Sequence, residues 1–371
     1  MSSDDKPKLP QDVVVDILKH LPVESLLRFR CVCRSWRSTI DDPRFVALHF
    51  DSSALGASNW HKVCLDWSDP LRNLCSVFSD VSLTLPLQLQ IEVPFGAPDN
   101  RYVFIGSCNG LICVAKLHEI CYDPTIYLWN LFTRKYKVVL LPGLQHQRVD
   151  LGFGFDATSN DYKIVRLRDN PGRLGEEKPG VQVYSLRTDS WRSLEWKSLE
   201  CEAAAFRAPN PAVFFNGSLH WFILKFSDLM GTYVYGSILS FDLAGEVFDQ
   251  MALPEEFCND HSELSMAVLN GLLAVFIDCV EEGAGYPDSH SICSVWVMRE
   301  YGVPESLTKL YTFDVCALVN EFYGFTGNGE VLMSMDGRGL VSWNPITRQF
   351  ENLPLSTKCD MVTVVESLVS L

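Results

Sequence analysis

Apolar side chains near the start of the chain recur with the spacing of an α-helix. Val14, Ile17 and Leu18 stand at i, i+3 and i+4, which places them on one face of a helix. Two further short apolar groups follow, and the polar triplet at residues 41–43 ends the last of them. The pattern therefore predicts three short helices over residues 9–40.

From about residue 100 the chain changes to strand-like alternation and repeats a two-part pattern. Its first part is a hairpin signal, in which an Asn-Gly pair separates two apolar strands, because both residues tolerate the positive φ of a tight turn. A longer turn at residues 155–162 fills the gap between the first two copies. The copies are Cys108-Asn109-Gly110-Leu111, Phe215-Asn216-Gly217-Ser218-Leu219, Leu269-Asn270-Gly271-Leu272 and Gly327-Asn328-Gly329-Glu330-Val331.

The second part is a strand with a central aromatic residue, a polar turn and another strand. Successive aromatic positions are separated by 55, 57, 55 and 47 residues. A repeat of roughly 50 residues with about four strands per unit is typical of kelch-like β-propeller blades. The aligned aromatic residues are Trp129, Tyr184, Phe241, Trp296 and Trp343.

The two ends of this region contribute strands to a sixth blade. Residues 72–95 alternate without the full pattern, and residues 361–366 read as one more strand. Pairing that last strand into the first blade would remove two exposed sheet edges. We therefore expect a mainly β chain with a small α-helical N-terminal domain: three helices followed by a β-propeller of about six blades. A stacked or sandwich-like β arrangement is the alternative.

The helical unit is too small to bury its own apolar side chains. Some forty residues cannot enclose so much leucine, valine and tryptophan without a neighbour. Two explanations remain. The helices cap the rest of the chain, or they form a docking module whose apolar surface is completed by another protein.

The string LPQDVVVDILKHLPVESLLRFRCVCRSWRSTI resembles an F-box of the plant type, and the likeness covers residues 9–45 almost without a gap. The resemblance implies binding to a Skp1-like adaptor, which bridges to a cullin and a RING protein. Motif position alone does not separate side chains that touch the adaptor from side chains that pack internally. Those expected at or supporting the interface are Leu9, Pro10, Val14, Ile17, Leu18, Leu21, Pro22, Leu26, Leu27, Val32 and Trp36.

The remainder resembles the F-box-associated domain of large plant families, which include S-locus and defence-related F-box proteins. The phrases FIGSCNGLICV, LGFGFDATSNDYKIVRL and VESLVSL carry this likeness. A Gly-Gly pair closing a strand in each unit is missing, so the kelch label describes architecture only. The expected division is an F-box at 1–50, a linker with first-blade strands at 51–100, and an F-box-associated kelch-like propeller at 101–371.

Charge is distributed unevenly between these parts. Residues 1–50 carry a net charge of +1, which leaves −16 for residues 51–371 of a chain with a total of −15. This balance argues against nucleic acid, whose binders need a basic surface. A basic protein partner would suit the acidic region, although a solubilising surface explains it equally simply.

We expect an intracellular chain outside the membrane. The first eight residues are polar and unlike a secretory signal, and no apolar run approaches the roughly 18 residues of a membrane span. The 13 cysteines are scattered and never spaced C-x-x-C, which favours reduced, buried thiols over a disulfide framework. The expected location is the cytoplasm, the nucleus or both.

The sequence contains no pattern for catalysis, a metal or a cofactor. It has no H-E-x-x-H, P-loop or G-x-S-x-G motif. The eight histidines are dispersed, and His220 is interpreted as a hydrogen-bonded strand residue. We expect no cofactor, no catalytic residue and no metal ligand.

Two loop insertions are the candidates for a target-recognition surface. Residues 169–180 and 280–290 interrupt strand pairs with Gly, Pro and acidic residues, as exposed connections do. The alternative is that both are tolerated surface insertions. The candidate side chains are Arg173, Glu176, Glu177, Glu281, Glu282 and Tyr286.

The function expected from these features is recognition. The F-box would dock to the adaptor of an SCF-type ubiquitin ligase, and the β domain would present an unidentified target protein for ubiquitination and degradation. The chain would contribute proximity and no bond chemistry of its own. One alternative is a non-degradative, adaptor-bound assembly protein. A further alternative is a propeller lectin or enzyme with a helical cap.

Overall fold

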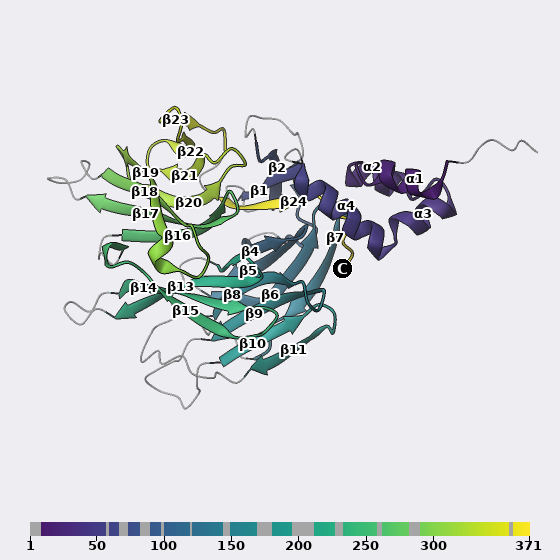
Figure 1. Ribbon diagram of the computed structural model, residues 1–371, viewed down its shortest axis with the longest axis horizontal. Coiled ribbons are helices and arrows are strands. Elements are labelled where there is room, and N and C mark those ends of the chain that lie inside the picture. Colours follow the sequence, from purple (N-terminus) through teal and green to yellow (C-terminus); the bar gives the residue numbers. More distant parts are fainter. Residues whose placement is uncertain are drawn as a thin grey trace, which may run out of the picture.

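Four helices precede six four-stranded sheets in the computed structural model of this protein (Figure 1). The structure describes residues 9–56, 59–66, 73–81, 90–97, 100–118, 121–143, 149–168, 180–194, 211–226, 233–257, 262–281, 290–355 and 359–371. The helices are α1 (Gln11–Leu18), α2 (Val23–Phe29), α3 (Arg34–Ile40) and α4 (Pro43–Leu55). Two 3-10 turns, η2 (Glu255–Phe257) and η3 (Pro304–Ser306), lie between strands.

Each sheet is one blade of a propeller, and its strands run antiparallel. From the inner to the outer strand, blade 1 consists of β24 (Cys359–Val365), β1 (Trp60–Asp66), β2 (Leu74–Ser79) and β3 (Gln90–Glu92). Blade 2 consists of β4 (Arg101–Cys108), β5 (Leu111–His118), β6 (Cys121–Asn130) and β7 (Lys135–Leu140). Blade 3 consists of β8 (Val149–Asp156), β9 (Asp161–Arg168), β10 (Gly180–Ser185) and β11 (Ser190–Leu194). Blade 4 consists of β12 (Val213–Phe215), β13 (Ser218–Phe226), β14 (Tyr233–Asp242) and β15 (Phe248–Ala252). Blade 5 consists of β16 (Ser262–Leu269), β17 (Leu272–Glu281), β18 (His290–Met298) and β19 (Leu307–Val315). Blade 6 consists of β20 (Val319–Phe325), β21 (Val331–Met335), β22 (Gly339–Asn344) and β23 (Gln349–Asn352).

The C-terminal strand closes the ring of blades. β24 pairs antiparallel with β1, from Trp60↔Val365 to Asp66↔Cys359. As the inner strand of blade 1, it also contacts the inner strands β4 and β20 of the two neighbouring blades. The predicted mainly β fold, its six blades and the pairing of the last strand with the first blade are all confirmed.

The repeated sequence pattern corresponds to equivalent places in successive blades. All five aligned aromatic side chains are buried. In three of the four Asn-Gly turns both residues have positive φ, as at Asn109 (47°) and Gly110 (80°). The fourth differs, because only Gly329 has positive φ and Gly329 N–H donates to the carbonyl of Thr326. That turn is a longer loop than the pattern predicts.

The three predicted helices are present, but the sequence interpretation missed a fourth. Residues 41–43 end α3 as expected and then start α4, because Asp42 Oδ1 accepts a hydrogen bond from Arg44 N–H (2.8 Å) and Pro43 occupies the first turn. The face of α4 turned inward carries Phe45, His49 and Ser53. Two of these three side chains are polar, so apolar spacing does not reveal the helix.

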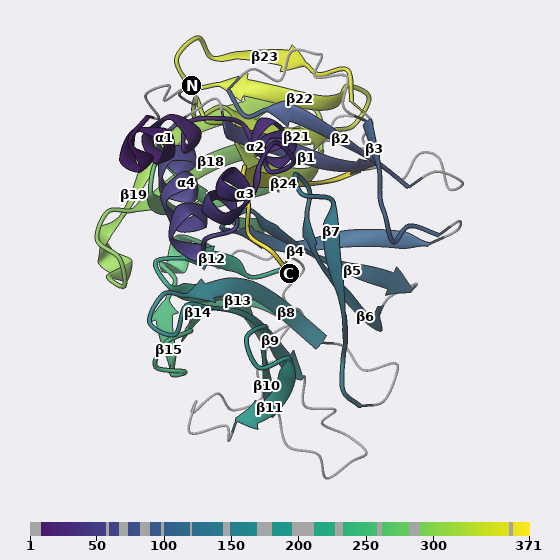
Figure 2. The same cartoon turned by 90° about the vertical axis from the view of Figure 1, so that its right-hand side faces the viewer.

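The helical unit stands against one face of the propeller (Figure 2). That face carries the turns that follow the inner and the third strand of a blade. In blade 2, Gly110 of the β4–β5 turn lies against Ser367, and Phe132 of the β6–β7 turn packs against the helices. The alternate connections between strands therefore leave from the opposite face. We call the first the helix-bearing face and the second the distal face.

Candidate functional site

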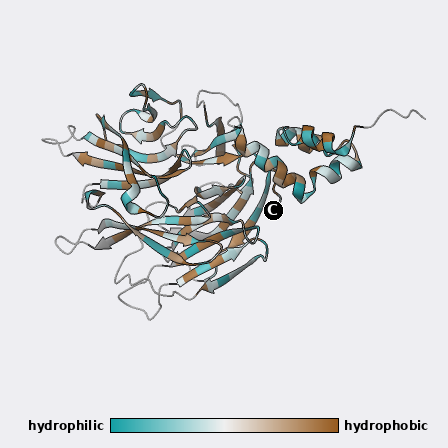
Figure 3. Ribbon diagram, viewed as in Figure 1, coloured by the Kyte–Doolittle hydropathy of each residue, from teal (hydrophilic) through white to brown (hydrophobic). Residues whose placement is uncertain are grey.

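The outer side of the helical unit exposes a row of aliphatic side chains. Val13 and Ile17 are spaced four residues apart on one face of α1, and Leu9 lies two residues before this helix. The exposed fractions of Leu9, Val13 and Ile17 are 63%, 42% and 52%. Val32, in the turn before α3, is 65% exposed. Hydrophobic colour on these helices is visible in Figure 3. Clustered exposed aliphatic groups on a small unit indicate a surface that a partner covers.

The structure separates the eleven residues of the F-box motif by position. Leu18 and Leu26 are fully buried and support the surface from beneath. Val14, Leu21, Leu27 and Trp36 are partly buried. Leu9, Pro10, Ile17, Pro22 and Val32 are exposed. Val13 belongs to the exposed row although the motif comparison did not select it.

Contacts between the helices hold this outer surface in shape. The rings of Phe29 and Trp36 lie 5.1 Å apart between centroids, which joins α2 to α3. Gln11 Nε2 donates to Thr39 Oγ1 at 2.8 Å and joins α1 to α3. The Asp41 carboxylate, fixed by the guanidinium of Arg30, has its pKa held below the ordinary value. These links set the spacing between α1 and the turn that carries Val32.

The inner side of the unit is completed by the C-terminal tail, residues 366–371. Leu368 joins Leu18, Val23, Leu26 and other apolar side chains in one buried cluster. A short helical unit thus obtains from the propeller part of its core, which it could not build alone.

Polar contacts fasten the same tail to blade 2. Asn130 Nδ2 donates to the carbonyls of Ser367 (2.9 Å) and Val369 (2.8 Å). Lys135 Nζ donates to Ser370 Oγ at 3.2 Å. The tail therefore touches the helices on one side and the propeller on the other.

Two histidines lie at the junction where the helical unit, the C-terminal tail and the propeller meet. His49 of α4 is bonded through Nε2 to the carbonyl of Leu21 (3.0 Å), and its burial lowers its pKa. His61 of β1 faces the Glu366 carboxylate at 3.6 Å. For Glu366, burial acts to raise the pKa, but the adjacent His61 ring and the hydrogen bond donated by Val23 N–H outweigh it and hold the pKa below its usual value. The junction thus favours an ionised Glu366.

The distal face is where the two predicted recognition loops attach. The first connects β9, ending at Arg168, to β10, beginning at Gly180, and the second connects β17, ending at Glu281, to β18, beginning at His290. Of the candidate side chains, Arg173, Glu176, Glu177, Glu282 and Tyr286 lie outside the described residues, as does the side chain of Glu281. Their role in recognition stays a prediction.

The described residues contain no group of three or more His, Cys, Asp or Glu side chains that could hold a metal ion. His220 is a strand residue with both ring nitrogens bonded, to the Val213 carbonyl (3.1 Å) and to Tyr301 Oη (2.9 Å), as predicted. Burial lowers its pKa to about 4. Across the same described part of the chain, no helix is long and apolar enough to cross a membrane.

Comparison with known proteins matches both parts of the chain. The F-box domain family matches residues 7–48, and the F-box associated beta propeller domain family matches residues 72–335, well over half of the chain. F-box/kelch-repeat protein At3g23880 of Arabidopsis thaliana is 28% identical over 312 residues, which cover 81% of this chain and 78% of that protein. F-box protein At3g07870 of the same plant is 25% identical, with 93% and 87% covered.

A third relative from Arabidopsis thaliana, F-box protein CPR1, is 29% identical over 339 residues, with 85% of this chain and 75% of that protein covered. The two family matches fall on the helical unit and on the propeller described above. This agreement of sequence and architecture extends over both parts. The chain belongs to the plant F-box proteins that carry an F-box associated beta propeller domain.

Proposed function

We propose that this chain is the substrate-recognition subunit of an SCF-type E3 ubiquitin ligase. Its F-box would bind a Skp1-like adaptor, and through it a cullin and a RING protein. The propeller would hold a target protein for ubiquitination and degradation. We further propose the division into an F-box at 1–50, a linker with first-blade strands at 51–100 and the propeller domain at 101–371.

The observation that carries this proposal is the exposed aliphatic row formed by Val13 and Ile17 of α1 and by Leu9, just before the helix. The inner side of the same helices is already occupied by the propeller tail through Leu368. An internal cap would need one apolar side, whereas this unit has two. The second side fits a separate partner, and burying an aliphatic side chain contributes about 1.5–3 kcal/mol before ordering costs.

The role proposed for the propeller is binding, not bond chemistry. Holding a target near the ubiquitin-charged enzyme turns an intermolecular transfer into one within a complex. We place this activity in the cytoplasm, the nucleus or both, in keeping with the ten cysteines whose side chains the structure describes, all of which are free thiols. The target is a protein that remains to be identified.

The test is capture of a purified Skp1-like adaptor by the full-length protein. The variant Leu9→Ala/Ile17→Ala/Val32→Ala should lose capture by tenfold or more, at roughly 1 kcal/mol per truncated contact. Ile346→Ala is the matched control, because Ile346 is an 89% exposed aliphatic residue of blade 6. Equal capture by the triple variant would exclude this surface as the dock.

A second measurement separates the ligase role from simple assembly. Reconstitution with the adaptor, cullin, RING protein and charged ubiquitin enzyme should give ubiquitin transfer to lysines of the bound chain or its target. Adaptor capture without any ubiquitin transfer would instead favour an adaptor-bound assembly protein.

A further inference from the structure

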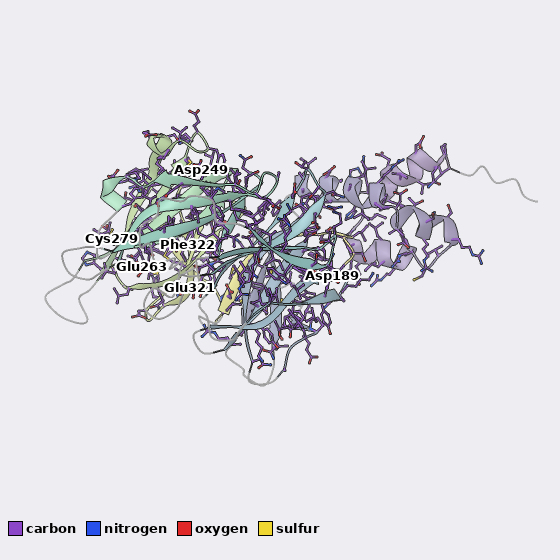
Figure 4. The ribbon with its side chains drawn as sticks, turned by 90° about the horizontal axis from the view of Figure 1, so that it is seen from below. Asp189, Asp249, Glu263, Cys279, Glu321 and Phe322 are labelled. Carbon is purple, nitrogen blue, oxygen red and sulfur yellow. The ribbon has the colours of Figure 1, made fainter. Side chains whose placement is uncertain are left out.

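Three thiols are exposed among the ten cysteine side chains that the structure describes: Cys31, Cys33 and Cys316. Six others are buried, and the partly exposed Cys279 lies on the side of the propeller away from the helices in Figure 4. Cys31 and Cys33 stand on either side of Val32, the 65% exposed residue in the turn before α3. Two of the three exposed thiols therefore belong to the surface on which the adaptor is proposed to dock.

The sulfur atoms of this pair make opposite kinds of hydrogen bond. Cys31 Sγ donates to the carbonyl of Leu27, one helical turn earlier, at 3.7 Å. Cys33 Sγ accepts from Trp36 N–H at 3.5 Å and so caps α3. The thiolate is the attacking form of a cysteine, and a sulfur that accepts a hydrogen bond keeps that bond when it loses its proton. Cys33 is therefore the better placed nucleophile of the two.

Arginines surround Cys33 in the sequence. Residues 28–37 contain four arginines and no acidic residue. The carboxylates of Glu24 and Asp41 pair with three of these guanidinium groups. The fourth belongs to Arg34, which directly follows Cys33, is exposed, and has no ion-pair or hydrogen-bond partner among the residues that the structure describes. An unpaired guanidinium attracts carboxylates, with which it forms charge-assisted hydrogen bonds.

Cys316 has the opposite surroundings. It directly follows β19, and residues 312–320 contain Asp314 and neither lysine nor arginine. The protein thus carries one exposed thiol beside a cation, Cys33, and another near an anion, Cys316. A negatively charged reagent should favour the first thiol, and a positively charged reagent should not.

We propose that Cys33 is a site of reversible S-glutathionylation and that the adduct prevents docking of the adaptor. The reagent is glutathione disulfide, an anionic low-molecular-weight disulfide whose carboxylates match the unpaired guanidinium of Arg34. This inference rests on the proposed function of the helical unit as the adaptor dock, and it names a regulation of that surface.

The modification is a thiol–disulfide exchange in which glutathione disulfide is the oxidant. The Cys33 thiolate attacks one sulfur of the reagent, so an S–S bond between Cys33 and glutathione forms as the original S–S bond breaks. The second glutathione leaves with the electron pair of the broken bond and takes up the proton that Cys33 released. An excess of reduced glutathione drives the same exchange backward, so the modification is reversible.

The adduct changes the docking surface in two ways. A tripeptide attached beside Val32 occupies space that a partner must fill, and it brings charged groups into an aliphatic surface, where their burial is costly. Docking and modification therefore exclude one another. A bound adaptor covers Cys33, and a modified Cys33 weakens the adaptor by the same coupling.

The first test compares two disulfides on the full-length protein, anionic glutathione disulfide and cationic cystamine. Limited treatment followed by peptide mass spectrometry gives the modified fraction at each cysteine. Glutathione disulfide should modify Cys33 about fivefold faster than Cys316, and this preference should disappear with cystamine. An equal preference for Cys33 with both reagents would overturn the charge match, and earlier modification of Cys31 or Cys316 would overturn the site.

Arg34→Gln should slow the reaction of Cys33 with glutathione disulfide and leave its reaction with cystamine no slower. Arg299→Gln is the matched control, because Arg299 is an exposed arginine that follows β18 in blade 5 and the charge change is the same. It should keep the wild-type rate at Cys33. Equal slowing by both variants would reduce the effect to net charge and overturn the role of Arg34.

The second test measures capture of a purified Skp1-like adaptor before and after treatment with glutathione disulfide. Capture by the wild type should fall about tenfold and return with dithiothreitol. Treatment should leave capture by Cys33→Ser unchanged, because serine forms no disulfide and still offers an acceptor to Trp36 N–H. Cys316→Ser is the matched control and should lose capture as the wild type does. Loss of capture in treated Cys33→Ser would overturn the proposal.

Protection by the adaptor provides the reverse measurement. Adaptor bound beforehand should shield Cys33, but not Cys316, from glutathione disulfide. Equal capture by reduced and glutathionylated protein would overturn this inference alone. Reduced wild type that captures no adaptor would overturn the proposed function, and the mass spectra of the same samples would still decide whether Cys33 is the modified thiol.

Discussion

Glu366 Oε2 accepts a hydrogen bond from the backbone N–H of Val23 at 3.0 Å, across 343 residues of sequence. Val23 begins α2 of the F-box, and Glu366 directly follows β24, the strand that closes the propeller. The carboxylate thus meets one of the unpaired N–H groups at the start of a helix. Closure of the propeller and orientation of the F-box therefore depend on the same segment.

Replacement of Glu366 by Ala should loosen the F-box from the propeller. The Val23 N–H would lose its acceptor in a partly buried site, at about 1–3 kcal/mol. We expect faster amide hydrogen exchange in α2 and little change in the strands of blades 3 to 5. Unchanged exchange at Val23 would contradict a coupling role for Glu366.

The same contact should weaken in acid. Because the pKa of Glu366 is lower in the folded state than in the unfolded state, its contribution is present above the unfolded value near ~4.3 and is lost as pH falls through the folded value. Glu366→Gln should remove this acid dependence while keeping an oxygen acceptor for Val23. Amide hydrogen exchange in α2, measured between pH 6 and pH 3 for the wild type and for Glu366→Gln, checks this prediction.

Gly110 and Gly271 offer a matched pair for testing the packing of the tail. Both occupy tight turns with positive φ, +80° and +73°, so alanine strains the backbone equally at about 1 kcal/mol. A Cβ at Gly110 would lie 2.1 Å from Ser367 Cβ, whereas nothing lies within 4 Å at Gly271. Gly110→Ala should therefore lower the melting temperature more and displace the tail.

The contact between Gly110 and the tail also predicts a difference in proteolysis. If the tail holds the F-box, Gly110→Ala should increase proteolysis between α4 and β1, while Gly271→Ala should not. Equal melting temperatures and equal proteolysis for the two variants would show that the tail accommodates the methyl group without moving.

Neighbouring residues of α1 should give opposite phenotypes. Leu18 is buried against the tail, so Leu18→Ala should lower the free energy of unfolding by about 2–4 kcal/mol. Ile17 is half-exposed, so Ile17→Ala should leave stability within about 0.5 kcal/mol and reduce adaptor capture. Thermal unfolding and adaptor capture, measured for both variants, test this difference. A large loss of stability in Ile17→Ala would contradict the orientation assigned to α1.

Local spacing was sufficient to predict the repeated part of this fold. Trp129 and Trp343 could be assigned to buried strands because their neighbours alternate and the pattern recurs in each blade. α4 was missed because His49 and Ser53 occupy inward positions where apolar residues were sought.

The functional surfaces were harder to predict for a different physical reason. Ile17 and Leu18 are chemically alike, and only the position of the propeller decides which one is exposed. The pairing of Glu366 with Val23 and the gathering of Glu321 with Asp360 join residues far apart in sequence or in separate blades. Spacing along the chain carries no signal for such contacts, whereas the propeller closure that creates them could be predicted.

Asp360 gives the propeller an unusual response to pH. Burial raises its pKa to about 7, Glu321 acts in the same direction, and Arg101 and the two backbone N–H groups oppose it. Because the folded pKa exceeds the unfolded value near ~3.9, the contribution to stability is fully present below pH ~4 and is lost as pH rises through 7. Between pH 5 and pH 8 the free energy of unfolding of the wild type should fall by about 2–3 kcal/mol through this group.

The Asp360→Asn side chain cannot ionise, so the free energy of unfolding of this variant should vary less over this range. Loss of one acceptor oxygen should lower that free energy by the same amount at every pH. The control is Asp249→Asn, because Asp249 is an exposed carboxylate on β15. Urea unfolding at each pH should show that this control keeps the wild-type change of unfolding free energy with pH. The same change in Asp360→Asn would show that another group titrates.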